Sequence, residues 1–168
     1  VLNLLVSSHG WADFVDYAIL NDGTFAGTVK INNASDATTY LVLGSSNALG
    51  NGTTVVETGN RGDKNIVSLN ASVVNLKALT GNGVVQVCKQ NGSAGLSSAV
   101  LNLSNASGTF SGTIDTGTTV NVNGGSLTLG ACTVKGALVQ GADAAVTLAG
   151  SINNTGSVTL AGVVDLAS

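Results

Sequence analysis

Apolar and polar residues alternate in short runs along most of the chain. Examples are Val120-x-Val122, Leu127-x-Leu129, Val146-x-Leu148 and Val158-x-Leu160. Alternation with a period of two places one row of side chains on the buried face of a strand. The runs are short, and Gly, Asn, Thr or Ser residues punctuate them. The pattern predicts an all-β domain of many short strands over residues 21–168.

The spacing of these runs separates two β architectures. In the last third, the apolar centres lie near residues 121, 128, 134, 139, 147, 152, 159 and 165. Sandwiches and barrels usually place a strand about every 8–12 residues, whereas a spacing of about 6 leaves little room for hairpins. Three short strands and three bends fit a coil of about 20 residues, which favours a parallel β-solenoid. A β-sandwich, pilin-like subunit is the alternative.

The N-terminal segment, residues 1–20, follows another pattern. Apolar residues recur at i, i+3, i+4, i+7 and i+8, as Trp11, Phe14, Val15, Ala18 and Ile19. That spacing is one face of an amphipathic helix. We therefore expect residues 1–20 to form a short N-terminal helical cap or an assembly segment, with an irregular apolar strand as the rival interpretation.

Two segments recur at nearly the same distance along the chain. Gly23–Val29 returns as Gly108–Ile114, Leu41–Gly44 returns as Leu127–Gly130, and the two offsets agree within one position. Other repeats have different periods, which favours a right-handed β-helix with loops of variable length. Phe25-Ala-Gly-Thr-Val and the Leu-Val-Leu-Gly run at 41–44 resemble the autotransporter-associated β-strand repeat. That resemblance implies a secreted right-handed β-helix, the passenger domain of a bacterial autotransporter and often an adhesin.

Composition narrows the function classes. Charged residues make up 9% of the chain, against roughly 25% in typical soluble domains. The net charge is −3 and no basic stripe is present, so the footprint of a nucleic-acid binder is missing. The chain contains no run of about 18 apolar residues, the length that would predict a membrane-spanning helix. The opening VLNLLV lacks the basic flank of an intact signal peptide, so we expect a mature or excised extracellular product.

Few residues could carry chemistry. Cys88 and Cys132 are the only cysteines and form a candidate disulfide, or else two separate buried thiols. His9 is the sole histidine and has no ordered catalytic partners in the sequence. Asp13 and Asp16 could share a helix face, but a solvated face is the simpler interpretation. We expect no catalytic residue, no metal site and no cofactor.

Two short motifs point to recognition at a surface. Arg61-Gly62-Asp63 is an integrin-type tripeptide in the most polar stretch of the chain. Seven asparagines stand in Asn-x-Ser/Thr sequences as candidate glycosylation sites: Asn33, Asn51, Asn70, Asn91, Asn102, Asn105 and Asn153. The alternative for these asparagines is a ladder of stacked side chains that bond between coils.

These observations predict a non-enzymatic extracellular structural or adhesive module and a self-assembling surface filament subunit. The expected partners are further copies of the chain, head to tail, or surface glycans, with no nucleic acid and no membrane span. A polysaccharide-binding or polysaccharide-degrading β-helix is the alternative, although aromatic side chains, which commonly stack on sugars, are only 4% of the residues.

Overall fold

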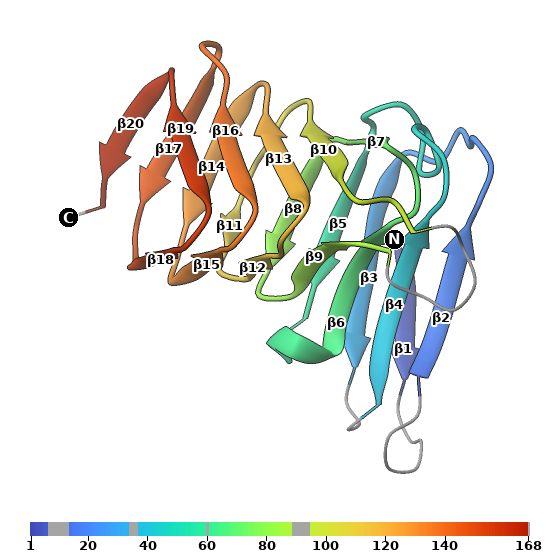
Figure 1. The fold of residues 1–168 in the computed structure, drawn as a ribbon. Coiled ribbons are helices and arrows are strands. Elements are labelled where there is room, and N and C mark those ends of the chain that lie inside the picture. The colour runs from blue at the N-terminus through green and yellow to red at the C-terminus, as the bar shows by residue number, and fades with distance from the viewer. Residues whose placement is uncertain (7–13, 34–36, 60, 89–94, 168) are drawn as a thin grey trace.

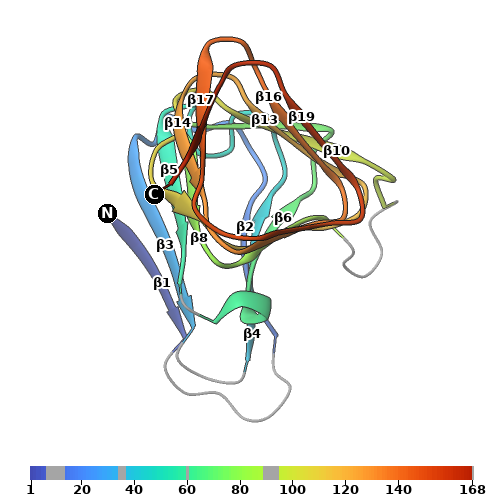
Figure 2. The same cartoon turned by 90° about the vertical axis from the view of Figure 1, so that its left-hand side faces the viewer.

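The chain is a stack of β coils in which the described strands pair in parallel with their neighbours (Figure 1). The structure, a computed structural model, describes residues 1–6, 14–33, 37–59, 61–88 and 95–167. Over these residues it contains three parallel sheets and one short 3₁₀ helix, η1 (Gly62–Lys64). Seen along the stack, the C-terminal coils outline a triangle with one sheet on each side (Figure 2).

The strands follow one another around the coils and return to the same sheet. Sheet A contains, in spatial order, β1 (Leu2–Val6), β3 (Gly27–Asn33), β5 (Thr54–Thr58), β8 (Ala78–Gly81), β11 (Thr109–Phe110), β14 (Gly125–Leu129), β17 (Ala144–Leu148) and β20 (Val163–Leu166). Sheet B contains β2 (Phe14–Ile19), β4 (Thr38–Leu43), β6 (Asn65–Leu69), β9 (Val84–Val87), β12 (Thr113–Ile114), β15 (Cys132–Val134) and β18 (Ile152–Asn154). Sheet C contains β7 (Val73–Leu76), β10 (Ala99–Leu103), β13 (Thr118–Val122), β16 (Ala137–Gln140) and β19 (Ser157–Leu160).

The alternating pattern explains the core. In β13, Val120 and Val122 are buried while Asn121 between them faces outward. The register places Val120 beside Leu101 in one adjacent coil and beside Leu138 in the other. Inward rows from all three sheets thus stack into one continuous aliphatic core, because the pleat sends every second side chain to the same face.

The predicted β-solenoid is confirmed at the level of parallel stacked coils. The β-sandwich alternative is wrong, because all strand pairs among the described residues are parallel. Each of the eight apolar centres predicted between residues 121 and 165 falls within its own strand, from β13 to β20. Leu129 pairs with Leu148, a separation close to the expected coil length. Val29 pairs with Val56, a longer separation, so the earlier coils carry longer bends.

The predicted N-terminal helix is wrong where the structure describes it. Residues 14–19 form β2, which lies parallel to β4 along six paired positions. Aromatic and β-branched residues such as Tyr17 and Ile19 favour strands, and pairing with β4 supplies hydrogen bonds that a lone helix would make within itself. Trp11, His9 and Asp13 lie outside the described residues. None of the described residues belongs to a helix long and apolar enough to cross a membrane.

The sequence repeats do not occupy equivalent places. Thr28-Val29 lies in β3 of sheet A, whereas its counterpart Thr113-Ile114 lies in β12 of sheet B. Leu41–Leu43 lies in sheet B and Leu127–Leu129 in sheet A. All three sheets require the same local sequence, an apolar row next to a Gly bend, so similar segments recur in different sheets.

Candidate functional site

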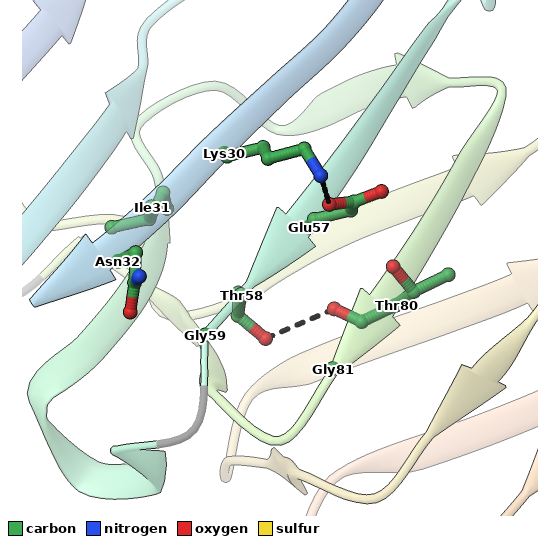
Figure 3. A pocket seen from close by; sticks show the side chains of 8 residues that line it. All are labelled: Lys30, Ile31, Asn32, Glu57, Thr58, Gly59, Thr80 and Gly81. Carbon is green, nitrogen blue, oxygen red and sulfur yellow. Dashed lines mark hydrogen bonds and ion pairs between the residues drawn. The ribbon is translucent and has the colours of Figure 1, made fainter. Parts of the chain in front are cut away.

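A polar bay opens where three strands of sheet A end. It has a volume of about 300 Å³ and lies at the C-terminal ends of β3, β5 and β8 (Figure 3). Its lining residues are Lys30, Ile31, Asn32, Glu57, Thr58, Gly59, Thr80 and Gly81. We call this site the sheet A bay.

Glycines at the bends keep the bay open. Gly81 has φ +94°, a conformation that side chains rarely adopt, and a Cβ there would clash with the backbone carbonyl of Thr58. At Gly59, a Cβ would come within 2.5 Å of the Asn32 side-chain oxygen. The two bends therefore leave space that ordinary side chains would fill.

Thr58 holds the floor of the bay. Its hydroxyl donates to the Thr80 carbonyl at 3.0 Å and accepts from the Gly83 amide at 2.8 Å. Thr58 is buried, with 4% of its surface exposed, so both partners of the hydroxyl come from the protein. This side chain thus ties the end of β5 to the next coil and fixes the position of the bend after β8.

An ion pair forms the rim. Lys30 and Glu57 lie opposite each other in the register of β3 and β5, and Lys30 Nζ lies 2.6 Å from Glu57 Oε2. The two side chains are 43% and 40% exposed, so water screens the pair and its contribution to stability is small. The pair offers one cationic and one anionic group to a ligand.

The chemistry of the bay suits binding better than hydrolysis. Cleavage of a glycosidic bond requires two carboxyl groups held about 5–9.5 Å apart across the bond. Glu57 is the only carboxylate among the residues that line the bay, and it already pairs with Lys30. Hydroxyl, amide and charged groups on an open surface can instead hydrogen-bond a polyhydroxylated ligand.

The Arg61-Gly62-Asp63 tripeptide lies at the corner that follows the bay along the chain. Arg61 precedes η1, which contains Gly62 and Asp63, and β6 begins directly afterwards. Arg61 and Asp63 are exposed. The Arg61 carbonyl accepts from the Lys64 amide at 2.8 Å and from the Asn65 side chain at 3.4 Å, which fixes the turn. The tripeptide is therefore presented to solvent on an ordered turn.

One candidate glycosylation site is part of a ladder. The Asn102 side chain donates to Asn75 and accepts from Asn121, both at 3.0 Å, on the outer face of sheet C. Asn75 in turn donates to Asn47 at 3.3 Å. The ladder interpretation is thus confirmed for Asn102, whose amide nitrogen is engaged in the stack.

The other candidate asparagines that the structure describes lie outside this ladder. Asn51, Asn105 and Asn153 are exposed and Asn70 is half-buried, in separate coils. Asn33 ends β3, and Asn91 lies outside the described residues. Asn51 and Asn105 are next in the chain to Gly52 and Ser104, and the Ser104 hydroxyl donates to the Gly52 carbonyl at 2.9 Å.

Cys88 and Cys132 are both buried free thiols. Cys132 begins β15, whereas Cys88 follows the end of β9, and β12 separates those two strands in sheet B. Thr133 pairs with Thr113 in the adjacent coil, and Thr113 pairs with Val84 in the coil beyond it. Cys132 therefore aligns with the residue before Val84, whereas Cys88 lies four residues after Val84. The two cysteines are thus two coils and five positions apart. That separation exceeds the α-carbon distance a disulfide can span.

Within the described ranges, no three His, Cys, Asp or Glu residues lie close enough to form a metal site.

The residues of the sheet A bay carry no sequence motif. Their proximity depends on the pairing of strands from successive coils, as in Lys30 with Glu57 and Glu57 with Thr80. The chain has no significant match to a protein-family model, a curated protein or a solved structure.

Proposed function

We propose that this chain is a non-enzymatic extracellular structural or adhesive module, a right-handed β-helix of the autotransporter passenger type. The observation that carries the proposal is the uninterrupted stack of parallel coils around one aliphatic core. Such a stack is a stiff spacer, because each coil is bonded along its edges to the coils before and after it. Polar ladders on the outside, such as Asn75–Asn102–Asn121, add bonds along the same axis.

Adhesion is assigned to the corner formed by the sheet A bay and the Arg61–Asp63 turn. The bay offers hydroxyl, amide and charged groups that suit a surface glycan, and the turn carries two exposed charged residues, Arg61 and Asp63. Recognition of such groups needs few residues when an ordered scaffold holds them. The rest of the stack of coils then acts as the spacer.

A bead assay tests this assignment. Beads coated with the chain should adhere to glycan-coated or cell surfaces, and removing the Lys30–Glu57 pair with Lys30→Met/Glu57→Leu should reduce adhesion. Asp63→Glu, which keeps the charge but lengthens the side chain, separates the contribution of the turn from that of the bay. Adhesion that is unchanged in all these variants would refute the assignment to this corner.

The alternative is a β-helix that binds and cleaves polysaccharide, for which the open bay is the specific support. Incubation with neutral and acidic polysaccharides should give retention without new reducing ends. New reducing ends that disappear in Glu57→Gln would establish an enzyme and overturn the proposal.

Head-to-tail self-association remains part of the proposal. Val164 and Leu166 of β20 continue the inward row of Val146 and Leu148, are 40% and 78% exposed, and would be covered by a further β coil. Negative-stain microscopy of the purified chain should then show particles longer than one rod. Val164→Lys/Leu166→Lys should return them to single length, and unchanged lengths would count against this contact.

A further inference from the structure

The outer face of sheet A carries a column of side chains with opposite charges at its two ends. The register aligns one residue from each of seven consecutive strands, namely Lys30, Glu57, Thr80, Thr109, Thr128, Thr147 and Asp165. Thr80 and Thr109 align because the residues that follow them, Gly81 and Phe110, are paired. We call this row the sheet A column.

Between the Lys30–Glu57 pair at one end and Asp165 at the other, the side chains of the column are small and uncharged. Beside Thr109, Thr128 and Thr147 runs a second row of small residues, made of Ser107, Ser126 and Ala145. In the described part of the chain, no hydrogen bond engages the hydroxyls of those three threonines. Small side chains allow a second sheet to approach closely, and two sheets packed face to face lie about 10 Å apart.

We propose that this face pairs with the same face of a second copy, with the two rods antiparallel. A two-fold axis that runs along the strand direction at Thr109 exchanges the ends of the column. It brings Lys30 of each copy onto Asp165 of the other, and Thr109 onto its own counterpart. The contact is isologous, so it closes as a dimer. This dimer goes beyond the proposed function, since it joins rods side by side.

The charges select this arrangement over its alternative. A two-fold axis along the rod would keep the two copies parallel, with Asp165 facing Asp165 and Lys30 facing Lys30. Like charges in apposition disfavour an interface and opposite charges favour it. Lys30 lies beside Glu57 on its own sheet and is 43% exposed, so its flexible ammonium can contact both carboxylates.

The size of the face predicts a weak dimer. Six coil spacings of about 4.8 Å and a width of about four residues give roughly 400 Å² per copy. A standard stable interface buries about 800 Å² per partner. The dimer therefore forms where the local concentration is high, as between copies that are crowded on one surface.

Sedimentation equilibrium of the 168-residue chain, from about 10 µM to about 1 mM, tests the proposal. The wild type should shift from monomer toward dimer. Thr109→Lys places two like charges on the axis and should weaken the dimer at least about 10-fold. The matched control is Thr119→Lys, which adds the same charge to the outer face of sheet C and should leave the dimer unchanged.

A cross-linking measurement tests which face forms the contact. Thr109→Cys should be joined to its counterpart by a short bis-maleimide, whereas Thr119→Cys should not, and the native Cys88 and Cys132 are both buried. A monomeric wild type at the highest concentration, equal weakening by both lysine variants, or equal cross-linking of both cysteine variants would each overturn the dimer. Bead adhesion by the Thr109→Lys monomer reports on the proposed function separately, since the bay remains intact.

Discussion

The Asn102 side chain donates a hydrogen bond to the Asn75 side-chain oxygen at 3.0 Å, one coil away. Asn121 repeats the bond onto Asn102 at 3.0 Å, and all the amides point the same way along the stack. In the next coil the register places Val139 opposite Asn121, where this ladder ends. The position of a residue within the ladder therefore decides how many bonds its loss removes.

Replacing Asn102 with Ala should cost more stability than replacing Asn121. Asn102 makes two ladder bonds and Asn121 makes one. Each net bond contributes about 0.5–1.5 kcal/mol, so we expect losses of about 2 and about 1 kcal/mol in the free energy of unfolding. Urea denaturation measures both. Equal losses for the two variants would contradict the expectation that the loss follows the number of ladder bonds.

Gly81→Ala should destabilise the fold by about 2–4 kcal/mol. The left-handed backbone at φ +94° and the clash with the Thr58 carbonyl both oppose a Cβ at this position. Gly95→Ala is the matched control, because a Cβ there would meet nothing within 4 Å. Thermal unfolding of the two variants should separate them clearly. A Gly81→Ala protein as stable as the control would contradict the geometry of this bend.

Leu101→Ala should lower the free energy of unfolding by about 2–5 kcal/mol, because it leaves a cavity in the core. Leu101 is fully buried in β10, whereas its neighbour Val100 faces outward and is half-buried. Val100→Ala should therefore cost about 1 kcal/mol or less. The comparison checks which side chains of β10 face inward. A larger loss for Val100→Ala than for Leu101→Ala would mean that Val100, and not Leu101, faces the core.

Stability should fall at alkaline pH through Cys132. Burial raises the pKa of the Cys132 thiol above its ordinary value of 9.0. Below that value the thiol is protonated in both the folded and the unfolded chain, so its contribution to the free energy of unfolding is fully present. As pH rises further, the unfolded chain loses its proton first, so the free energy of unfolding decreases until the folded thiol also titrates.

Urea midpoints from about pH 7 to about pH 10.5 measure this decrease. Cys132→Val removes the titrating group and keeps an apolar side chain, so its alkaline decline should be shallower than that of the wild type. An identical decline in both proteins would assign the effect to other groups.

The sequence predicted the architecture best where strands are short and evenly spaced. The runs around Val120, Leu127 and Val146 alternate cleanly, and each became a strand in the expected kind of coil. Residues 14–19 gave a wrong prediction because their apolar positions also fit a helical stripe. Pairing with β4, a strand of the next coil, overrides that local pattern.

The sheet A bay could not be predicted because no local motif marks it. Lys30, Glu57 and Thr80 become neighbours only when the lengths of two successive coils are known. Those lengths depend on bends whose sequences are irregular. The Asn ladder carries a weaker signal, since Asn75, Asn102 and Asn121 each follow an apolar residue, but their alignment also requires the register.

Parallel coiling also governs how this protein comes apart. Each strand is hydrogen-bonded only to strands of the adjacent coils, so loss of an outer coil leaves the distant ones intact. Backbone amides should therefore exchange with deuterated solvent at rates graded along the axis, slowest near β10 and β13 and fastest at the outermost strands. A chain built this way can shed or add material one layer at a time, as a stack does, while the remainder keeps its shape.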